Sequence, residues 1–336
     1  MKFDFRTSCN LDLLNFINVL TRSEFYVREH GSAAQRFEAL LQPAFFDAVQ
    51  EAADINGSPM LGPILSLIVS AAPHFERRSL TKLLASPDFL FEHFSTTPYY
   101  SAEKWPQQVS ILGKIVPVIR ELERLGFREY WRSERLPLVE SVLQDLKRFA
   151  AQFRLEEEIE NMLGRGQAPD RITAYLCTFA APHGIKICGP RYIADVRFPR
   201  ETVIGVAVHE MFHPPYNAGR LKEELQALGE DPLLAESFRS QNPDYAYRTM
   251  EGFIEENVVE AMAISICHRL NLEPDPMGYF ARHDEGSHRF SVVLFDELRR
   301  RPKPADVPFE EYFRSLVRRL PLGALDQVYQ RILETG

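Results

Sequence analysis

The residues best suited to chemistry lie in one short run, His209-Glu210-Met211-Phe212-His213. Residues four apart on an α-helix lie on the same face one turn apart, so His209 and His213 can present their imidazoles to one metal ion. Glu210 lies about 100° around the helix, where it can approach a water molecule on that ion instead of the ion itself. Zinc with three protein ligands keeps a position open for water and lowers the pKa of that water. The run therefore predicts a hydrolytic centre with one Zn²⁺ per chain and Glu210 as general base.

We expect the third zinc ligand on a helix predicted over residues 244–270, which carries four competing glutamates near its start. Glu256 and Glu260 share one narrow face of that helix with small side chains. Small side chains let another helix approach closely, and two carboxylates on a half-buried face are costly unless a cation or histidines neutralise them. We therefore predict Glu256 as the third ligand. Glu260, one turn on, is predicted to accept a hydrogen bond from the outer ring nitrogen of a ligand histidine. The other face carries Glu251 and Glu255, whose charges can be satisfied in solvent.

An HExxH run followed by a glutamate on a later helix resembles the gluzincin branch of zinc peptidases, which includes the thermolysin-like and aminopeptidase N-like families. The resemblance implies His209, His213 and Glu256 as zinc ligands and Glu210 as the general base. The chain is more closely similar to uncharacterised bacterial peptidase-like domains with a His-Glu-x-x-His-x-x-x-Asn signature and a Glu-x-x-x-x-Ala helix. Asn217 and residues 256–261 match these two motifs, and the resemblance covers roughly residues 170–300.

Two segments depart from these families. Glu251-Gly252-Phe253 looks like the Asn-Glu-Gly-Phe segment of aminopeptidase N-like enzymes, although Met250 replaces the asparagine. That likeness would make Glu251 the ligand, so Glu251 stays the alternative to Glu256. The second departure is Pro214-Pro215, which removes two backbone donors and biases His213 away from α-helical geometry. We expect the motif helix, which is predicted from Glu201, to end at His213.

A transition-state oxyanion needs a donor besides the metal, and such enzymes often use a tyrosine or histidine. Tyr279 and His288 follow the glutamate helix and are the candidates, with Tyr279 preferred. The alternative for each is an ordinary packed ring whose polar tip is satisfied by its neighbours.

The elements that position these residues are mostly helices. Helical spacing of apolar residues runs from about residue 10 to 165 and includes a buried core helix near 63–73 and one long helix over 136–162. Short strands are predicted over 172–178, 184–188 and 191–196, directly before the motif helix, and a final helix pair over 308–319 and 323–334. We predict a predominantly helical α+β fold with a helical domain over 1–165. A zincin-like metallohydrolase domain over 166–336 would carry the small sheet beside the motif helix.

The charge and composition of the chain argue against several classes of partner and location. The net charge is −8 and no clustered basic face is written in the sequence, so nucleic acid is not expected as a partner. The longest apolar run is about ten residues, too short for a membrane span, and residues 1–6 lack the apolar stretch of a signal peptide. Four cysteines without a CxxC pair predict neither a zinc knuckle nor a disulfide framework. We expect a cytoplasmic protein.

These observations together predict a zinc metallopeptidase that hydrolyses amide bonds in a peptide or protein substrate. A catalytically inactive zinc-binding regulatory or interaction module is the alternative, although a purely structural site gains nothing from Glu210. A helical interaction protein with a chance motif would bind no metal. The sequence does not indicate the substrate, endo- or exo-cleavage, or the oligomeric state.

Overall fold

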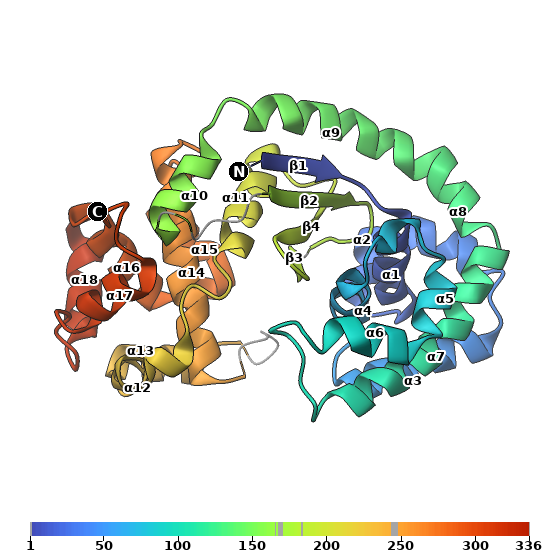
Figure 1. Ribbon diagram of the computed structural model, residues 1–336, viewed down its shortest axis with the longest axis horizontal. Coiled ribbons are helices and arrows are strands. Elements are labelled where there is room, and N and C mark those ends of the chain that lie inside the picture. The colour runs from blue at the N-terminus through green and yellow to red at the C-terminus, as the bar shows by residue number, and fades with distance from the viewer. Residues whose placement is uncertain (1, 165, 167–170, 183, 243–247, 336) are drawn as a thin grey trace. The chain divides into compact units, whose positions relative to one another are not determined.

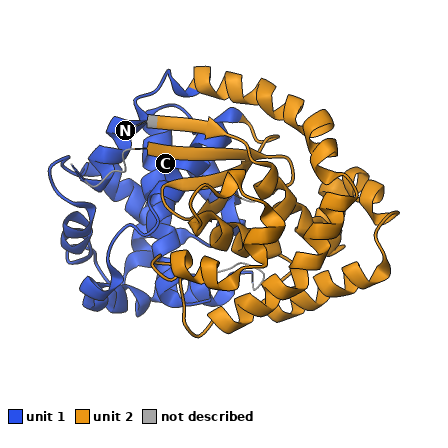
Figure 2. Ribbon diagram, turned by 45° about the vertical axis from the view of Figure 1, so that its right-hand side comes forward, with its two compact units in different colours: residues 1–2, 150–170, 200–336 blue, residues 3–149, 171–199 orange. Residues whose placement is uncertain are grey.

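The computed structural model describes residues 2–164, 166, 171–182, 184–242 and 248–335. They are mostly helical, with one four-stranded sheet, which confirms the predicted α+β class (Figure 1). Contacts divide the chain into two compact units, coloured in Figure 2. We call residues 3–149 with 171–199 the sheet unit, and residues 150–170 with 200–336 and the first two residues the motif unit.

The two units do not follow a single cut of the chain at residue 165. The segment just before that position belongs to the motif unit, and the strand segment after it belongs to the sheet unit. These units are compact by their contacts, and a compact unit is not the same as an independently folding domain. The two domains expected from the sequence, 1–165 and 166–336, therefore stay a prediction.

The sheet has the strand order β1-β2-β4-β3. Its strands are β1 (Lys2–Arg6), β2 (Arg171–Cys177), β3 (Ile185–Ile187) and β4 (Arg191–Asp195). Strand β4 runs parallel to β2, with Tyr175 opposite Ile193, and antiparallel to β3, so the sheet is mixed. The three predicted strands are confirmed. Strand β1 was not expected, although Lys2–Arg6 alternates polar and apolar residues as a half-buried strand does.

Helices make up the rest of the sheet unit. They are α1 (Cys9–Leu20), α2 (Glu24–Glu38), α3 (Pro43–Asn56), α4 (Leu61–Ala71), α5 (Leu80–Leu84), α6 (Pro87–Phe94), α7 (Trp105–Arg124), α8 (Phe127–Tyr130) and α9 (Leu136–Ala150), with a 3-10 turn η1 (Phe75–Arg77) and a π-helical turn η2 (Trp131–Arg135). Helix α4 is the predicted core helix, and it packs on α1 and β3. The buried carboxylate of Asp12 accepts hydrogen bonds from the Trp131 indole and the backbone N–H of Thr178, and so joins α1 to η2 and the end of β2.

Apart from Lys2 of β1, the helices and strands of the motif unit are all helices in its described residues. Its helices are α10 (Leu155–Leu163), α11 (Arg200–Met211), α12 (Lys222–Gly229), α13 (Pro232–Ser240), α14 (Met250–Arg269), α15 (Pro276–Arg282), α16 (Arg289–Arg300), α17 (Phe309–Val317) and α18 (Leu325–Thr335), with 3-10 turns η3 (Ala218–Arg220) and η4 (His283–Gly286). The final helix pair is confirmed as α17 and α18. The helix predicted from residue 244 is α14; residues 244–247 of that prediction lie outside the described residues, and Thr249 caps α14 by accepting from the backbone N–H of Gly252.

The prediction of one long helix over residues 136–162 is wrong. The segment forms α9 and α10, which are separated by residues 151–154. The break lets α10 pack its buried Leu155, Ile159 and Met162 in the motif unit, where it contacts α11 and α14. Periodicity alone missed the break because both pieces have an apolar stripe.

Helices α11 and α14 pack against each other and bring the chemistry-bearing residues together. Gly205 on α11 faces Cys267 on α14, where an added Cβ would lie 3.8 Å from the sulfur. Small residues at this contact allow the two helix backbones to approach closely, as expected from the sequence of α14. Among the described residues, no single helix is long and apolar enough to cross a membrane. Helices α3 and α4 reach that length and apolar character only when taken together, and they are bent by 83° where they meet.

Candidate metal centre

Helix α11 carries His209 and Glu210 in its last turn and ends at Met211. His213 therefore lies just beyond the helix, not on its last turn as predicted. The physical reason is Pro214, which disfavours α-helical geometry at the residue before it. Phe212 closes the helix with a backbone hydrogen bond to the carbonyl of His209, and the chain then turns.

Despite this turn, the two imidazoles and Glu256 converge on one point. The Nε2 atoms of His209 and His213 are 3.1 Å apart. Glu256 Oε1 lies 3.1 Å from Nε2 of His209, and Glu256 Oε2 lies 3.6 Å from Nε2 of His213. All three side chains are partly exposed, between 16% and 20%, so a small molecule can reach them from solvent.

The outer nitrogen of each ring faces a carboxylate. Nδ1 of His209 is 3.0 Å from Oε2 of Glu260, and Nδ1 of His213 is 3.0 Å from Oε1 of Glu255. In each pair the ring N–H at Nδ1 donates to the carboxylate, which leaves the lone pair of Nε2 pointing at the convergence point. Both rings are thereby held in the tautomer that can bind a metal.

Three acceptors that face one another repel unless a cation lies among them. Without a metal, a proton supplies that charge. Burial by itself would lower the pKa of His209, but the carboxylates of Glu256 and Glu260 outweigh burial and hold the pKa well above its usual value. Burial would likewise raise the pKa of Glu256, but the charge of His209 lowers it to about 2. The carboxylates around the two imidazoles therefore favour a positive charge at the point where the side chains converge.

The spacing of the three ligand atoms fits zinc. Zinc bonds of about 2.0–2.1 Å in tetrahedral geometry place neighbouring ligand atoms about 3.3 Å apart. The distance between the two Nε2 atoms and that from His209 Nε2 to Glu256 Oε1 are both 3.1 Å, close to that value. The other carboxylate oxygen, Oε2, lies 3.6 Å from His213 Nε2. Two imidazoles and one carboxylate form a three-ligand set of the kind that leaves a further position for water. The three residues therefore form a group that can hold a metal ion, and zinc stays a prediction.

The remaining residues of the predicted centre are placed as follows. Glu210 is buried beside His209 on α11. Glu251, the alternative ligand, is exposed at the first turn of α14 and does not join the cluster formed by His209, His213 and Glu256. Which glutamate binds the ion stays a prediction, but the structure brings Glu256 to the histidines. Asn217 caps η3 by accepting from the backbone N–H of Arg220.

The two candidate oxyanion donors lie next to Glu260. The pKa of Tyr279 is raised by burial and by the neighbouring Glu260 carboxylate, and its hydroxyl is 3.3 Å from Nδ1 of His283. His288 is almost fully buried against Phe253, and burial lowers its pKa. The oxyanion role stays a prediction for both residues.

Glu255 belongs to the candidate centre, and sequence reasoning missed it. We expected its charge to be satisfied in solvent, but its carboxylate pairs with His213. The sequence does hold a signal, because each ligand histidine needs a partner for its outer nitrogen and Glu260 can serve only one of the two rings. The position of His213 beyond the helix, which turns its ring toward Glu255, could not be read from spacing.

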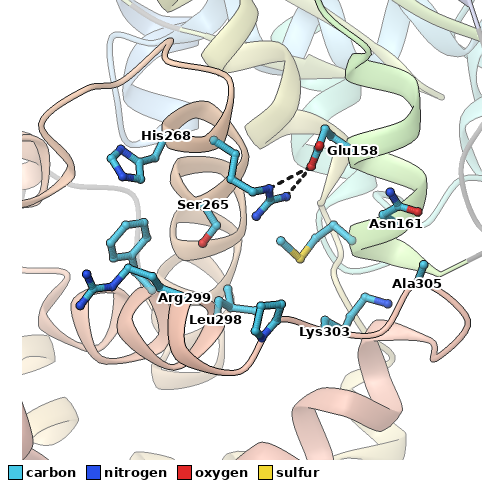
Figure 3. Close-up of a pocket in the computed structure, with 12 residues that line it drawn as sticks. Glu158, Asn161, Ser265, His268, Leu298, Arg299, Lys303 and Ala305 are labelled. Carbon is cyan, nitrogen blue, oxygen red and sulfur yellow. Dashed lines mark hydrogen bonds and ion pairs between the residues drawn. The ribbon is translucent and has the colours of Figure 1, made fainter.

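Figure 3 shows a separate pocket of about 370 Å³ in the motif unit, lined by residues of α10, α14, α16 and the segment after α16. Arg269 and Glu158 both line the pocket and form an ion pair at 2.6 Å. Lys303, which also lines it, donates to the carbonyl of Pro304. None of the predicted zinc ligands lines this pocket, so the pocket is not part of the candidate centre.

Comparison of the chain with protein-family models, curated proteins and solved structures found no match.

Removing either outer carboxylate is expected to weaken zinc binding without abolishing it. Glu260→Gln and Glu255→Gln keep the shape of the side chain but lose the charge that orients and polarises the ligand histidine, so zinc affinity should fall about 10–100-fold. Competition with a chromogenic chelator measures the change. Glu251→Gln, on the same helix, is the matched control and should titrate like the wild type. Unchanged affinity in both carboxylate variants would contradict the assignment.

Proposed function

We propose that this protein is a zinc-dependent hydrolase, most specifically a metallopeptidase with a zincin-like catalytic core. The observation that carries the proposal is the convergence of His209, His213 and Glu256, with both outer ring nitrogens held by carboxylates. A ligand set of this kind supports a catalytic role better than a structural one, because structural zinc sites are usually closed by a fourth protein ligand.

Each residue of the candidate centre has a distinct role in the proposed reaction. Zinc, when bound, supplies the Lewis acidity that polarises a carbonyl and acidifies water. His209, His213 and Glu256 would hold it, and Glu260 and Glu255 keep the two rings oriented. Glu210 would take the proton from the attacking water and return it to the leaving nitrogen, which requires a carboxylate at that position. Hydrolysis of an amide bond, and hence a peptide substrate, is supported by the resemblance of the motif to gluzincins.

The test is cleavage of an unbiased peptide mixture by the zinc-loaded chain, with new amino termini identified by mass spectrometry. We expect cleavage that a zinc chelator stops and added zinc restores. A zinc-loaded, folded chain that leaves every peptide and a set of protein substrates intact would overturn the metallopeptidase proposal. It would favour a zinc-binding regulatory module instead.

A further inference from the structure

A second group of metal-binding side chains lies in the motif unit, around η4 and the residue before α16. One ligand atom from each of His283, Asp284 and His288 lies within 4.8 Å of the others. None of the three is a ligand of the centre described above. A site made from them would therefore be a second, separate one.

The carboxylate of Asp284 lies between the two imidazoles. Its Oδ2 is 3.5 Å from Nε2 of His288, and its Oδ1 is 3.9 Å from Nε2 of His283. The two rings are 5.8 Å apart, centre to centre. Two imidazoles and one carboxylate suit zinc and similar transition ions, while magnesium and calcium prefer all-oxygen sites.

His283 is oriented for this role by Tyr279. The two rings stack with centroids 5.1 Å apart and an interplanar angle of 14°. A hydrogen bond in which the Nδ1–H of His283 donates to the Tyr279 hydroxyl, at 3.3 Å, leaves the Nε2 lone pair for a cation. In the first centre a glutamate carboxylate takes the place that the Tyr279 hydroxyl has here.

The backbone that carries Asp284 is held in an unusual conformation. Asp284 and Glu285 have φ values of 43° and 56°, in the left-handed region that non-glycine residues seldom adopt. Residues in this conformation persist only where the surrounding structure holds them. Here the turn places Asp284 between His283 and His288.

Glu260 adds a further carboxylate on the side of the first centre. Its Oε2 lies 3.9 Å from Nε2 of His283 and 3.0 Å from Nδ1 of His209. We propose that His283, Asp284 and His288 bind a second zinc-class cation, with Glu260 between the two sites. The ligand atoms are farther apart than in the first centre, and His283 is 36% exposed. The second site is therefore weaker and exchanges its ion with solvent more readily. The proposal does not depend on catalysis.

The test is a Zn²⁺ titration of the metal-free full chain, followed by native mass spectrometry and chelator competition. We expect two zinc ions per chain in the wild type, the second with lower affinity. Asp284→Asn and His283→Gln should each weaken the second site by more than about tenfold, because a lost ligand costs more than a lost outer partner. They should leave the first site in place. Glu285→Gln changes the same charge in the same turn and should bind like the wild type.

Glu256→Gln separates this proposal from the zinc centre itself. It should lose the tight site and keep the weak one. A wild type that binds one zinc ion, or Asp284→Asn and His283→Gln variants that titrate like the wild type, would overturn the second site. Neither of these results would bear on the first centre, whose loss is tested by variants of its own ligands, such as Glu256→Gln.

Discussion

Protein purified without added metal is expected to contain near one zinc ion per chain, and His213→Ala and Glu256→Gln are expected to lose it. Each variant removes one of three ligand groups whose polar atoms lie 3.1 to 3.6 Å from one another. The apparent free energy of zinc binding at small structural sites is about 10–16 kcal/mol and comes from about four ligands. The loss of one ligand should therefore lower the zinc affinity about 100-fold or more. Elemental analysis gives the stoichiometry, and chelator competition gives the affinity.

Glu251→Gln is the control that makes this result specific. It removes the same charge from the same helix, but Glu251 is exposed and outside the cluster. Its zinc content should equal that of the wild type. Zinc lost in Glu251→Gln and kept in Glu256→Gln would assign the ligand to Glu251 instead. If the folded wild type bound no zinc even when zinc was supplied, the assignment of a zinc centre would be wrong. Circular dichroism confirms that each variant is folded.

Glu210→Gln is expected to abolish turnover while the protein keeps its zinc. The amide cannot accept a proton from water, and loss of a general base reduces rates by about 10²–10⁴-fold. Glu210 is not one of the converging ligand residues, so the zinc content should stay the same. The measurement is the rate of peptide cleavage by the zinc-loaded variant, beside its zinc content and melting temperature.

Glu201→Gln, in the first turn of the same helix, is the matched control for this variant. Its side chain is 42% exposed, so the change should leave both the rate and the zinc content unaltered. If Glu210→Gln cleaved peptides as fast as the wild type, Glu210 would not be the base. If Glu210→Gln lost its zinc, its effect on turnover would instead be that of a residue needed to hold the metal.

Much of the candidate centre followed from the sequence itself. The spacing of His209 and His213 predicted two converging rings, and the helical projection of α14 placed Glu256 and Glu260 on one face. The structure has Glu260 on the outer nitrogen of His209, as predicted. The pattern on α14 is local, because side chains three or four residues apart on a helix are neighbours whatever the rest of the chain does. The convergence of the two rings is not a helical pattern in the structure, since His213 lies beyond the end of α11.

Other features were decided only by tertiary structure. The pairing of Glu255 with His213 depends on how the chain turns after Met211, and the cluster of His283, Asp284 and His288 depends on a left-handed turn between two helices. The break between α9 and α10 and the grouping of β2 to β4 with the first half of the chain also depend on packing partners far away in sequence. Periodicity carries no information on such contacts, because they are determined by which buried faces fit together.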